Sequence, residues 1–96
     1  MIPLSLLRNS FDKCKSLFQS DIKSHNFDIN LILIGENSLF DSLDYLTFIM
    51  QLEEDTKKLL NINLDLLSIE NLPTGDITIK KLFEHKKIEI IYGKKS

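Results

Sequence analysis

A serine between two aspartates is the feature of this chain that could carry chemistry. Ser42 lies in the stretch Asp41-Ser42-Leu43-Asp44, directly before a long amphipathic run. Asp41 is a good N-cap residue, and Asp44 follows it three positions later, as the acid of a capping box does. The pair predicts a helix that begins here with the hydroxyl of Ser42 at its N-terminus. That hydroxyl either helps to cap the helix or is a place where a group is attached.

Other residue types that carry chemistry show no pattern that indicates catalysis. Ser42 lacks the Gly-x-Ser-x-Gly turn of the hydrolase fold, and His25 and His85 have no spacing that identifies a triad. The sequence places no base beside Ser42, as a self-activated nucleophile would require. Cys14 lies on an apolar stripe and is expected in the core. One cysteine and two distant histidines predict no metal site. We therefore expect a protein that is not an enzyme.

Composition and charge limit the class of protein. The chain has 96 residues, of which 43% are hydrophobic and 27% charged, and this predicts one domain over residues 1–96. A net charge of -2 argues against nucleic-acid binding. The longest apolar run, residues 29–35, is too short to cross a bilayer. A single cysteine and the absence of a leader with a cleavage site favour a cytoplasmic protein, with a monomer as the default.

The elements around Ser42 follow from hydrophobic periodicity. A spacing of three and four predicts a first helix over residues 4–22, and the same rhythm predicts a second from Asp41 to Leu60. The apolar run at 31–34 is interpreted as a loop pinned into the core, because no second run alternates strictly enough to pair with it. A short helical turn is expected at 67–72, and a last helix from Ile77. Residues 88–96 either extend that helix or form a short C-terminal extension.

These elements predict an all-α fold. Three longer helices, one short helix and a long loop between the first two make a small four-helix bundle the expected architecture. In the second helix, the apolar rhythm runs through Leu43, Leu46, Ile49, Met50 and, after a polar turn, Leu59 and Leu60, and this predicts the face that is turned toward the core.

The acidic charge is concentrated around Ser42. Residues 35–56 hold six acidic residues and no basic residue, whereas residues 76–96 carry a net charge of +3. Such a run is usually a solvated face. A partner with a basic groove would instead use it for electrostatic steering. Along the helix, the acids that would face such a partner are Asp44, Glu53, Glu54 and Asp55.

The stretch DSLDYLTFIMQLEED, residues 41–55, resembles the signature of acyl carrier proteins. In that family, Asp-Ser-Leu opens the second helix, and an apolar repeat followed by Leu-Glu-Glu comes after it. The match needs no gap from Gly35 to Asp55. GENSLF and DITIKKLFEH also resemble the family's loop before the serine and its final helix. The likeness covers most of the chain, and residues 35–55 and 76–85 are its specific parts.

The resemblance implies a 4'-phosphopantetheine arm on Ser42, flanked by Asp41 and Leu43. A separate phosphopantetheinyl transferase would add the arm from coenzyme A, and its thiol would hold an acyl group as a thioester. Acyl-loading and acyl-transferring enzymes of fatty acid, lipid or secondary-metabolite biosynthesis would be the partners. They would meet the acids Asp44, Glu53, Glu54 and Asp55. The acyl chain would lie in a cleft between helices, although each lining residue also fits a plain core role: Leu46, Ile49, Met50, Leu64 and Ile79.

Departures from the family pattern favour a specialised, stand-alone carrier over the general carrier of fatty acid synthesis. Thr47 stands where many members have a third partner-facing acid, and Thr56 stands where a core aromatic residue is common. Two alternatives stay open. One is an aminoacyl or peptidyl carrier protein. The other is an unmodified helical interaction module that docks through the acidic face of the second helix.

Overall fold

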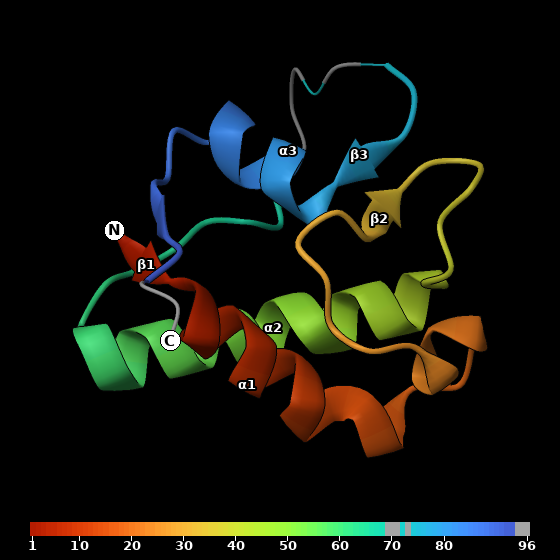
Figure 1. The fold of residues 1–96 in the computed structure, drawn as a ribbon, viewed down its shortest axis with the longest axis horizontal. Helices are drawn as coiled ribbons and strands as arrows, with labels where there is room; N and C mark the ends of the chain where they lie inside the picture. Colours follow the sequence, from red (N-terminus) through yellow and green to blue (C-terminus); the bar gives the residue numbers. More distant parts are fainter. Residues whose placement is uncertain (69–71, 73, 94–96) are drawn as a thin grey trace.

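Two long helices and one short helix surround the core, together with two small sheets. The computed structural model describes residues 1–68, 72 and 74–93. Helices α1 (Leu4–Cys14) and α2 (Ser42–Leu60) lie against each other, and α3 (Ile79–His85) covers the other side of the core (Figure 1). The fold is therefore mixed α/β, and the prediction of an all-α four-helix bundle is wrong.

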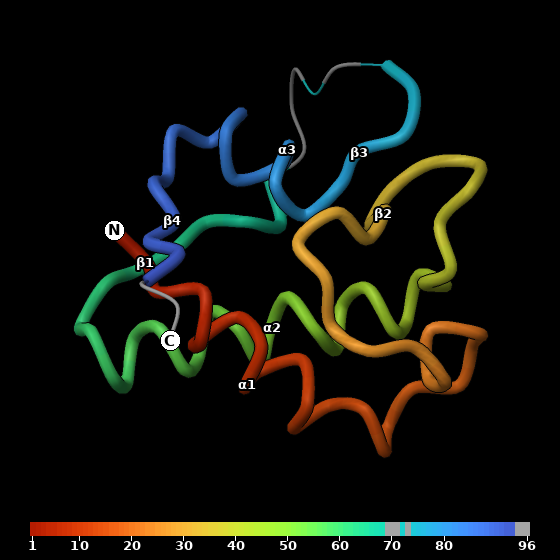
Figure 2. The backbone as a smooth tube through the Cα atoms, in the orientation of Figure 1, coloured from red at the N-terminus to blue at the C-terminus, as the bar shows by residue number. Residues whose placement is uncertain are grey.

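Short strand pairs join segments that are far apart in the sequence. Strand β2 (Ile32–Ile34) pairs antiparallel with β3 (Ile77–Thr78). Strand β1 (Ile2–Pro3) pairs in parallel with β4 (Ile90–Ile91), so that the start of the chain lies beside a segment near residue 90 (Figure 2). The pinned loop predicted at 31–34 is thus a strand. Its partner has only two residues, and the register shifts between Ile32 and Ile34. A pairing this short leaves no alternation that can be recognised in the sequence.

The first helix is shorter than predicted. It ends at Cys14, and two single 3₁₀ turns follow at Lys15–Leu17 and Asp21–Ser24. The chain leaves the helical path at Phe18, where ψ is 145°. The next N–H groups, those of Gln19 and Ser20, donate to the carboxylate of Asp44 and not to helical carbonyls. The apolar side chains that predicted this longer helix are still buried from Leu7 onward, namely Leu7, Phe11, Cys14, Phe18 and Ile22.

The second helix begins where predicted, but it turns a different face to the core. Asp41 is its N-cap, and its side chain accepts a hydrogen bond of 2.7 Å from the backbone N–H of Asp44. The inward face carries Phe48, Ile49, Leu52 and Thr56. Of the apolar residues predicted to point inward, Ile49 is buried and Leu60 packs partly buried against the core. The other four are exposed, at 64% for Leu43, 39% for Leu46, 57% for Met50 and 67% for Leu59.

An aromatic cluster fills the space between α1, α2 and the loop before α2. The ring of Phe11 lies 5.4 to 6.4 Å from four other rings, measured between centroids, and those rings belong to Phe18, Phe27, Phe40 and Phe48. Phe40 directly precedes Asp41, so this packing also fixes the entry to α2.

The segment that directly follows α2 is irregular as far as it is described. Residues 61–68 contain no helix, and half of the short helix predicted at 67–72 falls on residues 69–71, outside the described residues. At the other end, the chain from Ile88 to Ile90 packs partly buried against the core and is part of the fold. Residues 94–96 of the expected C-terminal extension lie outside the described residues.

Candidate functional site

Ser42 is the first residue of α2, and its side chain is exposed. The helix behind it runs for 19 residues. The first N–H groups of a helix have no intrahelical acceptors, and the helix dipole places partial positive charge there. A phosphate attached at this position would therefore be tolerated by the adjacent backbone. The cap formed by Asp41 uses the N–H of Asp44, and Ser42 itself is exposed.

Asp44 connects the start of α2 to the turn after α1. Its side chain is only 2% exposed and accepts hydrogen bonds from the N–H groups of Gln19 at 3.0 Å and Ser20 at 2.8 Å, and from the Ser20 hydroxyl. Burial would raise the pKa of Asp44, but the hydrogen bonds from Ser20 and Gln19 outweigh it and lower this pKa below its ordinary value. Asp44 is thus a buried structural acid, and its prediction as a partner-facing residue is wrong.

The predicted capping box is only half present. In a capping box, the acid at position 44 would accept a hydrogen bond from the backbone N–H of Asp41. Here that N–H lies 3.3 Å from the hydroxyl oxygen of Ser20 instead. Ser20 in turn donates to Asp44. A serine from a distant segment therefore completes the cap, and local spacing could not have indicated it.

Asp55 is also turned inward. It is 3% exposed and receives hydrogen bonds from Ser10 at 2.6 Å, Lys13 at 3.0 Å and Gln51 at 2.9 Å, so it joins α2 to α1. Burial would raise the pKa of Asp55, but these hydrogen bonds and the charge of Lys13 lower it. Asp55 is therefore not available to a partner, contrary to the prediction.

Glu53, a third acid predicted to face partners, is also engaged within the chain. Its carboxylate accepts the N–H of Leu66 at 2.9 Å and holds the chain that follows α2. Of the four acids predicted to face partners, Glu54 alone is exposed. The exposed side of α2 beside Ser42 carries instead the side chains of Leu43, Leu46 and Met50, which we call the apolar stripe of α2.

The five residues predicted to line an acyl cleft are divided between the core and the surface. Ile49 and Ile79 are fully buried in the core, whereas Leu46 and Met50 lie in the exposed apolar stripe. Leu64 lines a hollow at the N-terminal end of the chain, beside Met1 and Ile62. The cleft was a prediction from resemblance, and the arrangement of side chains contradicts it.

A different apolar hollow borders Ser42, and the sequence did not reveal it. It has a volume of about 240 Å³ and lies between β2, the loop that follows β2 and the first turn of α2. We call it the Ser42 hollow. Its lining residues are Leu33, Ile34, Gly35, Ser38, Phe40, Asp41, Ser42 and Tyr45. The signal that could have found it is the apolar run at 31–34, close before the serine.

Hydrogen bonds within the loop hold the wall of the Ser42 hollow in place. The hydroxyl of Ser38 lies 2.9 Å from the carbonyl oxygen of Ile32 and accepts the N–H of Phe40 at 3.1 Å. The carboxylate of Asp76 accepts the side-chain amide of Asn37 at 2.7 Å. The loop is thereby tied both to β2 and to the residue that precedes β3.

Tyr45 also lines the Ser42 hollow. Its hydroxyl oxygen is buried and finds no hydrogen-bond partner in the described part of the chain. Burial raises the pKa of Tyr45, and the negative charge of Glu53 raises it further. The tyrosine is therefore neutral at physiological pH and contributes an apolar ring to the hollow.

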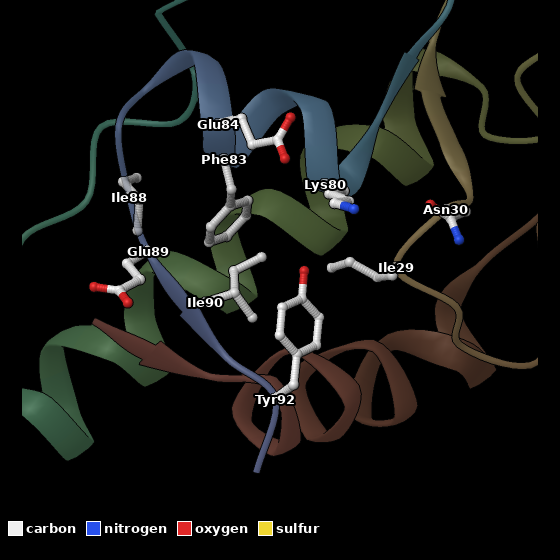
Figure 3. Close-up of a pocket in the computed structure, with 9 residues that line it drawn as sticks. All are labelled: Ile29, Asn30, Lys80, Phe83, Glu84, Ile88, Glu89, Ile90 and Tyr92. Atoms are coloured by element: carbon white, nitrogen blue, oxygen red, sulfur yellow. The ribbon is translucent and has the colours of Figure 1, made fainter.

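A larger hollow lies away from Ser42. It has a volume of about 400 Å³ and is formed where the C-terminal segment packs beside α3. In Figure 3, Phe83 and Ile90 point toward each other across it, and the hydroxyl of Tyr92 points toward Ile29 and Lys80. It shares no lining residue with the Ser42 hollow.

No family model, curated protein or solved structure matches the chain. In residues 1–68, 72 and 74–93, no helix has both the length and the apolar character needed to cross a membrane.

Proposed function

We propose that the protein is an acyl carrier protein that bears a 4'-phosphopantetheine arm on Ser42. The observation that supports this most directly is the position of the Ser42 hydroxyl. It is exposed at the capped start of a 19-residue helix and borders an apolar hollow. The resemblance of residues 41–55 to the carrier signature points to the same atom. An arm attached there begins next to helix N–H groups, which favour its phosphate.

The chain supplies the acceptor for the attachment and not the catalyst. The Ser42 oxygen would form a bond to the phosphorus next to pantetheine in coenzyme A. The pyrophosphate bond would break, and adenosine 3',5'-bisphosphate would leave. The serine proton would pass to a base of the transferase, because the carboxylate adjacent in the sequence, Asp41, is engaged with the N–H of Asp44. The arm then contributes a thiol that carries an acyl group as a thioester.

We place this chemistry in the cytoplasm, within fatty acid, lipid or secondary-metabolite biosynthesis, as a specialised carrier. An aminoacyl or peptidyl carrier uses the same arm and stays the alternative cargo class. The unmodified module that docks through an acidic face is less well supported. Three of its four acids, namely Asp44, Glu53 and Asp55, are held by hydrogen bonds within the chain.

We propose that partner enzymes contact the apolar stripe of α2. Leu43, Leu46 and Met50 are exposed on the same side of the helix as Ser42 and Glu54. Met50→Lys should therefore slow the transferase reaction, whereas Glu54→Lys should change its rate less than twofold at physiological salt. A larger effect of Glu54→Lys than of Met50→Lys would indicate that charge, and not apolar contact, guides these partners.

Intact mass spectrometry tests the proposed attachment. The protein is incubated with coenzyme A and a phosphopantetheinyl transferase of broad specificity, and we expect a gain of one phosphopantetheinyl group. Ser42→Ala should gain nothing. Ser5→Ala is the matched control, since Ser5 is also an exposed serine in the first turn of a helix, and it should be modified like the wild type. Failure of folded wild-type protein to gain mass, or a gain in Ser42→Ala, would refute the proposal.

A further inference from the structure

The Ser42 hollow borders the attachment atom itself, and this limits what can enter it. Along an extended chain each bond advances by roughly 1.2 Å, so the thiol of the arm, 14 bonds from the serine oxygen, reaches roughly 17 Å. The quaternary carbon with its two methyl groups is four bonds away, at roughly 5 Å. The part of the arm that can lie beside Ser42 without folding back is therefore this branched apolar group, and not the cargo.

The size and chemistry of the hollow fit the same group. Its volume of about 240 Å³ equals the space of about eight water molecules in the liquid, too small for the whole arm but sufficient for a quaternary carbon with its methyls and neighbours. Leu33, Ile34 and Phe40 and the ring of Tyr45 provide apolar walls. Burial of methyl groups against such walls is favourable in proportion to the apolar area removed from water.

We infer that the Ser42 hollow receives the dimethyl segment of the arm and holds its phosphate-proximal half against β2 and the first turn of α2. This inference rests on the proposed function. The hollow acts as a seat that sets the direction in which the arm leaves the protein. The two amides and the thiol beyond the dimethyl segment stay outside, so that the cargo is offered to enzymes and not stored within the fold.

Nuclear magnetic resonance of the loaded protein tests the inference. The arm is transferred from ¹³C-labelled coenzyme A, and complete loading is verified by intact mass. In an isotope-filtered experiment, we expect nuclear Overhauser effects from the two arm methyls to Ile34 and to the ring of Tyr45. Their signals should be shifted from those of free coenzyme A. Methyl signals at the free positions without such effects would overturn the inference, as would effects to Leu46 or Met50 in their place.

A pair of variants in β2 provides the control. Ile34→Phe places a larger side chain in the Ser42 hollow and should abolish the effects between the methyls and Tyr45. Ile32→Phe changes a residue of the same type and similar burial in the same strand that does not line the hollow, so it should retain them. If Ile34→Phe does not fold, the wild-type measurement alone decides. Loaded protein with a freely moving arm refutes the seat and leaves the proposed function intact, whereas absence of loading refutes both.

Discussion

Asp44 provides the sharpest test of how the structure uses its acidic residues. Replacement by alanine removes the acceptor of three hydrogen bonds, from the N–H groups of Gln19 and Ser20 and from the Ser20 hydroxyl. A hydrogen bond to a charged group contributes about 1.5–3 kcal/mol, and these three share one acceptor, so their contributions do not add fully. Because Gln19 is exposed, water can replace part of the loss. We expect Asp44→Ala to lower the free energy of unfolding by about 3 kcal/mol.

Urea denaturation at pH 7 measures this change, and a thermal scan should show a decrease of roughly 15 °C for a domain of this size. Glu54→Ala is the matched control, because Glu54 is an exposed acid on the same helix and should change stability by less than about 0.5 kcal/mol. Equal stabilities of the two variants would refute the conclusion that Asp44 is a buried structural acid.

The pH dependence of the Asp44 effect has a defined sign. The pKa of Asp44 in the folded protein lies below its ordinary value of 3.8. Its contribution to stability is therefore complete above about pH 4 and is lost as the pH falls through the folded pKa. The difference between wild type and Asp44→Ala should be large at pH 7 and should shrink toward pH 3. A difference that stays constant over this range would contradict a charged Asp44 in the folded state.

Three further predictions concern single sites. Gly35→Ala should destabilise by about 2–3 kcal/mol in urea denaturation, because φ is +130° and the new Cβ would lie 2.8 Å from the backbone Cα of Asp76. The same change at Gly93, which has open space around it, should cost about 1 kcal/mol. Tyr45→Phe removes a buried hydroxyl without a partner among the described residues, and it should raise stability by about 1 kcal/mol; a loss of stability would contradict this environment. Burial and the charge of Asp55 raise the pKa of the Cys14 thiol from 9.0 to about 11, although the charge of Lys13 opposes this shift. Iodoacetamide reacts with the thiolate, so at pH 8 it should alkylate the native protein about 100-fold more slowly than the unfolded protein, as measured by mass spectrometry.

Residue types and local spacing predicted α2 well because its ends are determined locally. Asp41 acts as the N-cap, and Asn61 ends the helix in the left-handed conformation with φ of 57°. The exposed position of Ser42 follows from the same local geometry. The start of the helix, and with it the candidate attachment site, could therefore be located from the sequence.

The inward face of α2 could not be predicted because two carboxylates lie on it. Periodicity assigns apolar residues to the core and acids to solvent. It therefore placed Asp44 and Asp55 on the outer face of the helix and predicted an inner face that includes Leu43, Leu46 and Met50. The partners that make these acids stable in the interior come from α1 and from the turn after it, up to 45 residues away. These hydrogen bonds are tertiary contacts, and no local pattern in the sequence indicates them.

The strands were missed for a related reason. The pairs β1–β4 and β2–β3 join residues at opposite ends of the chain or across α2, with two or three residues in each strand. Strands this short contribute few hydrogen bonds, and their stability depends on packing against the helices. The Ser42 hollow is walled by one of them, so its existence depends on a contact that the sequence does not display.

Because acidic side chains of α2 point inward, they affect how partner enzymes would find this protein. A domain of 96 residues has a small core, and here hydrogen-bonded acids help to join α1, α2 and the connecting turns. Carboxylates committed in this way contribute little to a docking surface, while apolar side chains surround Ser42 on α2. Encounter through apolar contact depends weakly on ionic strength, whereas steering by exposed charges is screened within about 8 Å at physiological salt. The rate of arm transfer to Ser42 should accordingly change little between low and physiological salt. A steep decrease would mean that exposed acids outside the α2 stripe, such as Glu36 and Glu54, guide the transferase.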